Sequence, residues 1–256
     1  KSVGVKIDRL TELFRPDIAF SLRNLGLKYS NEKIIEVRRD DNNDFERFSV
    51  EEINNGTLIS FCNGSSGKVS WFKNQNGEYD AYMDISNKQP ELVDQNGNLN
   101  QINNNPIIKR TAYNQLLKTD YKPNGENRIL FFVGESNFNK GCLFGSNEER
   151  NFAILSDNFI SPETSTNANV LNSKLNSNVF NYSGRIDLSN QLQQQGQFLL
   201  SLVANIYFTD DSFGFGYNKS SHLGYGMYSL QEFILFEKKV NINILEKIIN
   251  NYYNVF

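Results

Sequence analysis

The hydrophobic positions near the start of the chain follow the spacing of an amphipathic helix. The apolar residues are separated by four, three and four positions, which places them on one face of a helix of about three turns. They are Ile18, Leu22, Leu25 and Tyr29. A β-branched segment at 33–38 follows a turn and predicts a strand. We therefore expect a short N-terminal helix leading into a strand.

Most of the remaining chain alternates between short apolar segments and turn residues. Ser49 and Glu52 form a capping-box pattern, which predicts a short helix that breaks near Gly56 or resumes towards Cys62. The predicted strands cover 68–72, 106–110, 129–134, 152–155, 179–183, 198–208, 213–217 and 228–236. Many short strands with few helices are typical of an all-β fold, here an antiparallel β-sandwich.

The end of the chain predicts a second helix, over 242–253, whose apolar residues lie on one face. They are Ile244, Leu245, Ile248, Ile249 and Tyr252. We expect this C-terminal helix to dock against the sandwich. No internal repeat or linker interrupts the chain, so we predict one domain over 18–256, with 1–17 as a linker or an edge strand from a preceding segment.

Composition and charge narrow the classes of partner. The net charge is −3, which does not favour nucleic acid, and no apolar run is long enough to suggest a membrane span. Hydrophobic residues make up only 39 %, but 20 Phe and 12 Tyr supply large buried areas. The chain begins at Lys1 without a signal-like segment, so we expect it to be part of a larger polypeptide or assembly.

Few residues offer nucleophilic or metal chemistry. The two cysteines, Cys62 and Cys142, are predicted to be free and buried. The single histidine, His222, lies in a turn-like segment. A lone histidine in a loop is more often solvent-exposed than part of a catalytic triad or a metal cluster. Asp40, Asp41 and Asp44 offer oxygen ligands for calcium, but their spacing does not fit an EF-hand, so we predict no bound cofactor.

Several segments resemble one family in the same order along the chain. They are AFSLRNLGLKYSNEKIIEVRRD, LISFCNGSSGKVSWFKNQNG, KQPELV, NNNPIIKR and the ending YSLQEFILFEKKVNINILEKIINNYYNVF. They are similar to concanavalin-like (laminin-G-like) jelly-roll domains related to the catalytic domain of fungal α-L-arabinofuranosidase B, many of which occur in bacteriophage tail, fibre and other virion proteins. The resemblance implies a jelly-roll sandwich. It says less about activity, because function depends on the site rather than the fold.

The resemblance also allows a test for catalysis. Retaining glycosidases need two carboxyl groups about 5 Å apart. Asn218 stands where the relatives have their acidic Asp, and an amide cannot donate the catalytic proton. The strand expected to carry the nucleophile, at 151–155, has no carboxylate, and Glu148 or Glu149 could replace it only if the register shifts. We therefore expect no enzyme activity and keep an arabinofuranosidase-type hydrolase as an alternative.

The function that the resemblance favours is carbohydrate binding without cleavage, as a receptor-binding domain of a phage virion protein. The candidate ligand-binding residues lie in two rim loops: Tyr217, Asn218, Lys219 and His222 in one, Glu148 and Glu149 in the other. The expected partners are a host cell-surface glycan and other virion proteins, with a homotrimer as one possible assembly. The main alternative is a structural fibre or capsid-decoration domain.

Two further predictions concern conspicuous single residues. The only tryptophan, Trp71, lies in the middle of a predicted strand, where packing in the core is the expected use. Arg38 and Arg39 are expected to make structural ion pairs or surface contacts rather than ligand contacts.

Overall fold

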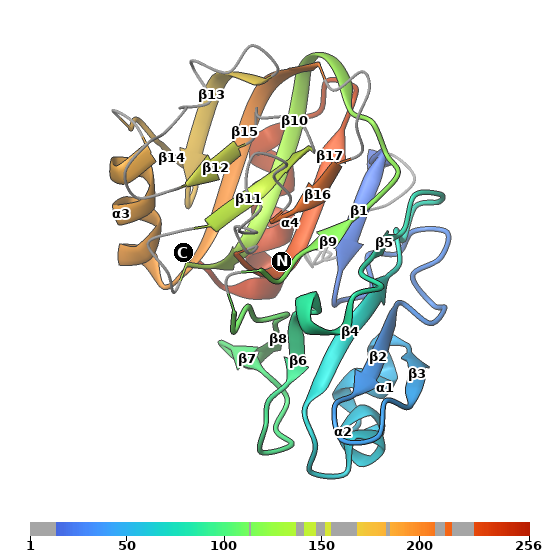
Figure 1. The fold of residues 1–256 in the computed structure, drawn as a ribbon. Helices are drawn as coiled ribbons and strands as arrows, with labels where there is room; N and C mark the ends of the chain where they lie inside the picture. Colours follow the sequence, from blue (N-terminus) through green and yellow to red (C-terminus); the bar gives the residue numbers. More distant parts are fainter. Residues whose placement is uncertain are drawn as a thin grey trace, which may run out of the picture.

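Two antiparallel sheets form most of the protein in the computed structural model (Figure 1). The structure describes residues 14–112, 114–136, 141–146, 152–154, 168–182, 185–207, 213–216 and 228–256. The predicted all-β class with an antiparallel sandwich is confirmed.

The first sheet has six strands in the order β1-β17-β10-β15-β13-β14, and it joins the two ends of the described chain. The strands are β1 (Ile18–Ser21), β17 (Ser229–Phe236), β10 (Asn124–Glu135), β15 (Gln197–Tyr207), β13 (Ala168–Leu175) and β14 (Asn178–Val179). Its centre is long, because β10 pairs with β15 on one side and β17 on the other, with a register shift in each pairing.

The second sheet has nine strands, in the order β12-β11-β16-β9-β5-β4-β2-β3 with β6 also on β4. The strands are β12 (Phe152–Ile154), β11 (Gly141–Ser146), β16 (Phe213–Phe215), β9 (Leu117–Lys118), β5 (Ala81–Tyr82), β4 (Gly67–Phe72), β2 (Ile35–Arg39), β3 (Phe45–Phe48) and β6 (Glu91–Val93). A separate hairpin joins β7 (Gln101–Ile102) to β8 (Asn105–Pro106).

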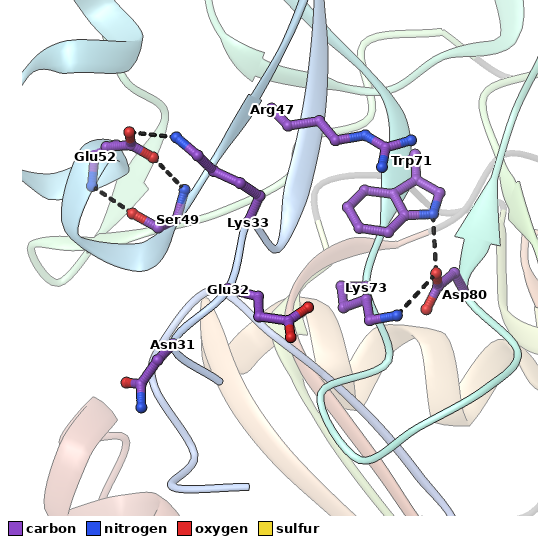
Figure 2. Close-up of a pocket in the computed structure, with 9 residues that line it drawn as sticks. All are labelled: Asn31, Glu32, Lys33, Arg47, Ser49, Glu52, Trp71, Lys73 and Asp80. Carbon is purple, nitrogen blue, oxygen red and sulfur yellow. Dashed lines mark hydrogen bonds and ion pairs between the residues drawn. The ribbon is translucent and has the colours of Figure 1, made fainter. Parts of the chain in front are cut away.

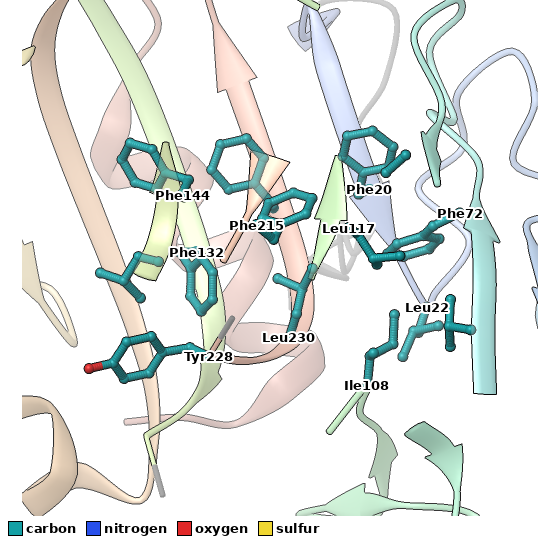
Figure 3. Packing of buried hydrophobic residues seen from close by; sticks show 14 of the residues in the cluster. Phe20, Leu22, Phe72, Ile108, Leu117, Phe132, Phe144, Phe215, Tyr228 and Leu230 are labelled. Carbon is teal, nitrogen blue, oxygen red and sulfur yellow. The ribbon is translucent and has the colours of Figure 1, made fainter. Parts of the chain in front are cut away.

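The larger core lies between the two sheets and is rich in phenylalanine (Figure 3). Phe20 and Phe233 of the first sheet meet Phe215 of the second, with ring centroids 5.6 and 5.1 Å away. These rings bury large apolar areas, which explains how a chain with a modest hydrophobic fraction fills a core.

A second, smaller core lies on the other face of the first sheet, under the C-terminal helix α4 (Ile242–Tyr253). Alternate residues of β10 point to the two cores: Leu130 and Phe132 face the second sheet, whereas Phe131 and Val133 face α4. Figure 1 shows α4 behind this sheet. The predicted terminal helix and its docking are therefore confirmed.

The other helices are short or polar. Ser49 caps α1 (Val50–Asn54) with both capping-box hydrogen bonds, and α2 (Thr57–Cys62) follows from Gly56, as the sequence predicted. A 3-10 turn, η2 (Ser86–Lys88), precedes β6, and α3 (Arg185–Gln195) precedes β15. Neither α3 nor β13 was predicted, whereas strands matching the segments at 68–72, 129–134 and 198–208 are present.

The predicted helix over 18–29 is wrong. Its first four residues form β1, which pairs with β17, and turns follow up to β2. The apolar residues Ile18, Leu22 and Leu25 are buried as predicted, but from a strand and a loop. The sequence therefore predicted correctly which of these residues are buried, but it predicted the wrong secondary structure for the segment.

The side chain of Gln75 explains why this segment is not a helix. Its amide donates to the carbonyls of Ser21 and Arg23, both at 2.8 Å, and its carbonyl oxygen accepts from the backbone N–H of Leu25 at 3.1 Å. These bonds satisfy buried backbone groups that a helix would satisfy internally. Gln75 is itself fully buried, so the loop is held from within.

One buried ion pair connects distant parts of the fold, and two local pairs lie at the end of β2. Arg23 pairs with Glu232 at 2.7 Å, with both side chains excluded from solvent. Arg38 donates to Gln89 and pairs with Asp40 at 2.8 Å, while Arg39 pairs with Asp41 at 2.6 Å. The structural ion pairs predicted for Arg38 and Arg39 are confirmed.

Candidate functional site

A β-bulge in β4 determines where the only tryptophan points. Trp71 pairs with Glu36, but the next pair is Val69 with Val37, so Ser70 is an extra residue on β4. Val69 and Phe72 are both in the core, and Trp71 is half-buried on the opposite face. Bulges commonly redirect a side chain next to a functional site. The expected core packing of Trp71 is therefore wrong.

The bulge is held by Ser70 itself. Its hydroxyl donates to the Glu36 carboxylate at 2.9 Å, and its carbonyl accepts the backbone N–H of Met83 at 2.8 Å. These bonds satisfy polar groups that the interrupted pairing leaves free. The outward position of Trp71 is thus built into the sheet.

Trp71 lines a pocket of about 730 Å³ (Figure 2). The lining is one aromatic ring surrounded by charged and polar side chains: Asn31, Glu32, Lys33, Arg47, Ser49, Glu52, Trp71, Lys73 and Asp80. They come from the turn before β2, from β3, from the start of α1 and from β4 with the loop after it. A concave site with convergent polar groups around an apolar surface is the usual form of a small-ligand site.

One wall of the pocket is the capped end of α1. The Glu52 carboxylate accepts from the backbone N–H of Ser49 at 2.7 Å and also pairs with the ammonium of Lys33. The hydrogen bond from Lys33, followed by that from Ser49, lowers the pKa of Glu52. This carboxylate is therefore fixed as an anion within the wall.

The opposite wall is built around Asp80. Its carboxylate accepts from the indole N–H of Trp71 at 3.1 Å, from the backbone N–H of Asn74 at 3.0 Å and from Lys73 at 3.3 Å. The guanidinium of Arg47 lies 4.3 Å from the centre of the indole ring. These contacts hold the ring in one orientation, which is what a binding surface needs.

Polar and aromatic residues continue from the pocket across the sheet. Arg47 pairs with Glu36 at 2.9 Å, and Trp71 is the register partner of Tyr82 on β5. The ammonium of Lys118 on β9 lies 4.8 Å from the centre of the Tyr82 ring. The site is therefore part of a wider polar face rather than an isolated hollow.

All six ligand-binding residues predicted from the sequence lie outside the described residues: Tyr217, Asn218, Lys219, His222, Glu148 and Glu149. The strands next to them, β16 and β11, stand towards one end of the second sheet, whereas β4, β2 and β3 stand at the other. The pocket is lined by other residues, which sequence reasoning did not predict as a site. The one available signal was an isolated tryptophan among charged neighbours.

The acidic turn considered for calcium is occupied by protein contacts. Asp40 accepts from Arg38 and from the Ser66 hydroxyl, and Asp41 accepts from Arg39. Asp44 accepts from the amide of Asn42. Within the described ranges, no group of three or more acidic, histidine or cysteine side chains is arranged to hold a metal ion.

Comparison with protein families, with curated proteins and with solved structures finds no match for this chain. In the part of the chain that the structure describes, no helix is long and apolar enough to cross a membrane. What the protein binds must therefore be inferred from its own residues.

Proposed function

We propose that this protein is a carbohydrate-binding domain and that the Trp71 pocket holds the sugar. The observation that carries the proposal is the bulge at Ser70, which takes the only tryptophan out of the core and into a pocket of charged and polar side chains. Exposing part of a large aromatic side chain on a polar face costs free energy, so its placement there favours a binding role. The indole N–H of Trp71 is held in this position by its hydrogen bond to Asp80.

The chemistry of the pocket suits a sugar. The C–H faces of a pyranose pack against an aromatic ring, and its hydroxyl groups both donate and accept hydrogen bonds. Trp71 supplies the apolar surface of the pocket, part of which the Arg47 guanidinium covers at 4.3 Å from the ring centre, and carboxylate, ammonium and amide groups surround it. A purely apolar ligand would have to desolvate these charges without replacing their hydrogen bonds.

Binding without cleavage is the form of the proposal that the pocket favours. Hydrolysis needs a proton donor and a second carboxylate on either side of one bond. Here Glu52 already pairs with the ammonium of Lys33 and accepts from the backbone N–H of Ser49. Asp80 already pairs with the ammonium of Lys73 and accepts from the backbone N–H of Asn74. The sequence resemblance to jelly-roll domains of virion proteins supports a receptor-binding role on a virion, with a host surface glycan as the ligand.

The test uses the fact that Trp71 is the only tryptophan. A printed array of neutral, acidic and amino oligosaccharides is probed first, and the best hit is then titrated while indole fluorescence is recorded. We expect a saturable change in emission. We also expect Trp71→Ala to weaken array binding by about tenfold or more, as truncation of an aromatic anchor does.

The matched control is Phe45→Ala, which removes a 54 % exposed aromatic side chain from β3 outside the pocket. It should bind like the wild type, and circular dichroism should show that both variants are folded. The proposal is wrong if no glycan binds, or if Trp71→Ala binds as well as Phe45→Ala. Release of reducing sugar from a bound glycan would contradict the non-catalytic form of the proposal.

A further inference from the structure

The charges that line the Trp71 pocket are balanced. Lys33, Arg47 and Lys73 supply three positive charges, and Glu32, Glu52 and Asp80 supply three negative ones. Binding sites for acidic ligands depend on cations whose charge is not already compensated. The formal charge of this lining, zero, does not favour an anion.

Each cation of the pocket is also paired individually. Lys33 pairs with Glu52, and Lys73 pairs with Asp80 at 3.3 Å. Arg47 pairs through its Nε with Glu36, at 2.9 Å, just outside the lining. An acidic sugar would have to compete with a carboxylate already held at each of these positions.

One carboxylate remains available. Among the described residues, no side-chain hydrogen bond or ion pair involves Glu32, which is exposed on the turn before β2. Figure 2 shows its carboxylate between the capping-box residues and the Trp71–Asp80 side of the pocket. Glu32 is therefore positioned to accept hydrogen bonds from a ligand and to repel a negative one.

Donors are available on the other side of the pocket. Arg47 uses only its Nε for Glu36, so its two terminal nitrogens have no partner within the described part of the chain. A hydroxyl group can accept from such a donor and donate to a carboxylate at the same time. Opposed donors and acceptors with no net charge therefore match a neutral polyol.

We infer that the pocket selects neutral saccharides over acidic ones and that Glu32 is the residue that excludes the acidic sugars. This inference rests on the proposed carbohydrate-binding function and adds the class of sugar. The carboxylate of Glu32 accepts hydrogen bonds from ligand hydroxyls. The same negative charge opposes a uronate or another carboxylated sugar.

The experiment compares the best neutral oligosaccharide from the array with its derivative oxidised to a uronate at the primary alcohol. Both are titrated by calorimetry against the wild type, Glu32→Gln and Glu46→Gln. We expect the wild type to bind the neutral sugar roughly tenfold more tightly, as one negative charge at contact distance in a partly solvated site allows. Affinity for the neutral sugar should be nearly independent of salt.

Glu32→Gln should bring the two affinities to within about twofold of each other, because the amide keeps the shape but not the charge. Glu46→Gln makes the same charge change at an exposed position of β3 outside the pocket and should leave the preference unchanged. A uronate that binds as tightly as its neutral parent, or a preference unaltered in Glu32→Gln, overturns the inference while the binding function stands. Failure of every glycan to bind overturns both.

Discussion

Removing Arg23 should destabilise the protein more than removing any surface cation. The Glu232 carboxylate accepts from Arg23 at 2.7 and 3.0 Å, and from Ser21 and Tyr253 at 2.7 and 3.3 Å. Arg23 is 1 % exposed and Glu232 is fully buried. Arg23→Met would leave a buried carboxylate with two neutral donors and no counter-charge.

The expected loss follows from that burial. Breaking a buried ion pair by removing one partner costs about 3–5 kcal/mol, because the remaining charge is desolvated without compensation. The guanidinium also lies 4.9 Å from the ring centre of Tyr252, so a cation–π contact to the second core is lost as well. The total is a large part of the roughly 5–15 kcal/mol that usually stabilises a domain.

Equilibrium unfolding in urea, followed by circular dichroism, measures this loss. The midpoint of Arg23→Met should fall by roughly 1–2 M relative to the wild type. Asp41→Asn, which breaks the exposed pair with Arg39, is the control and should leave the midpoint almost unchanged.

A double variant separates unpaired charge from lost packing. Arg23→Met combined with Glu232→Leu removes both charges and should recover at least half of the stability that Arg23→Met loses. The reasoning is refuted if Arg23→Met loses less than about 1 kcal/mol. It is also refuted if the double variant loses the full sum of the two single variants.

Three further predictions concern the packing of Gly134 and the buried thiol of Cys62. Gly134→Ala should lower the free energy of unfolding by more than about 2 kcal/mol, because the added Cβ would lie 2.1 Å from the Ser229 carbonyl oxygen. Gly77→Ala is the control, because its Cβ would have no atom within 4 Å. Equal melting temperatures for the two variants would contradict this prediction. Burial raises the pKa of the Cys62 thiol to about 11, so in a Cys142→Ser background Cys62 should react with a disulfide reagent much more slowly when folded than in urea. Because the pKa is raised, the folded state holds the thiol proton of Cys62 more tightly than the unfolded state does. The stability that this difference contributes is complete below pH 9 and is lost as the pH rises towards 11. A Cys62→Ala variant should therefore lose less stability than the wild type over that interval.

The helices that sequence reasoning located correctly are those whose stabilising contacts are local. The capping box of α1 joins Ser49 to Glu52, three positions away. The helix α4 carries its apolar face in its own spacing, and that face is buried against the first sheet. Such contacts are visible in a short window of sequence.

The elements that were mispredicted depend on distant partners. β1 exists because it pairs with β17, more than two hundred residues later, and the loop after it is held by Gln75. The helix α3 was missed because its sequence is mostly polar, although Leu188 and Leu192 are fully buried on the same face. Tertiary contacts overrode local spacing in the first case, and supplied most of the stability in the second.

The candidate site was hidden for a related reason. A strictly alternating β4 would place Val69 and Trp71 on the same face, and the bulge at Ser70 separates them. One inserted residue changes the face of every side chain beyond it. The position of that insertion depends on the pairing with β2, which the sequence of β4 alone does not contain.

The residues that carry the family resemblance are mostly internal in this structure. Arg23 from the first quoted segment bonds to Glu232 from the last, and Gln75 from the second holds the loop between them. Contacts of this kind join segments that are far apart in the sequence. The same quoted segments also supply part of the Trp71 pocket: Asn31, Glu32 and Lys33 from the first segment, and Trp71 and Lys73 from the second. The remaining lining residues, Arg47, Ser49, Glu52 and Asp80, lie outside the quoted segments. The proposed sugar ligand must therefore be tested at the Trp71 pocket itself.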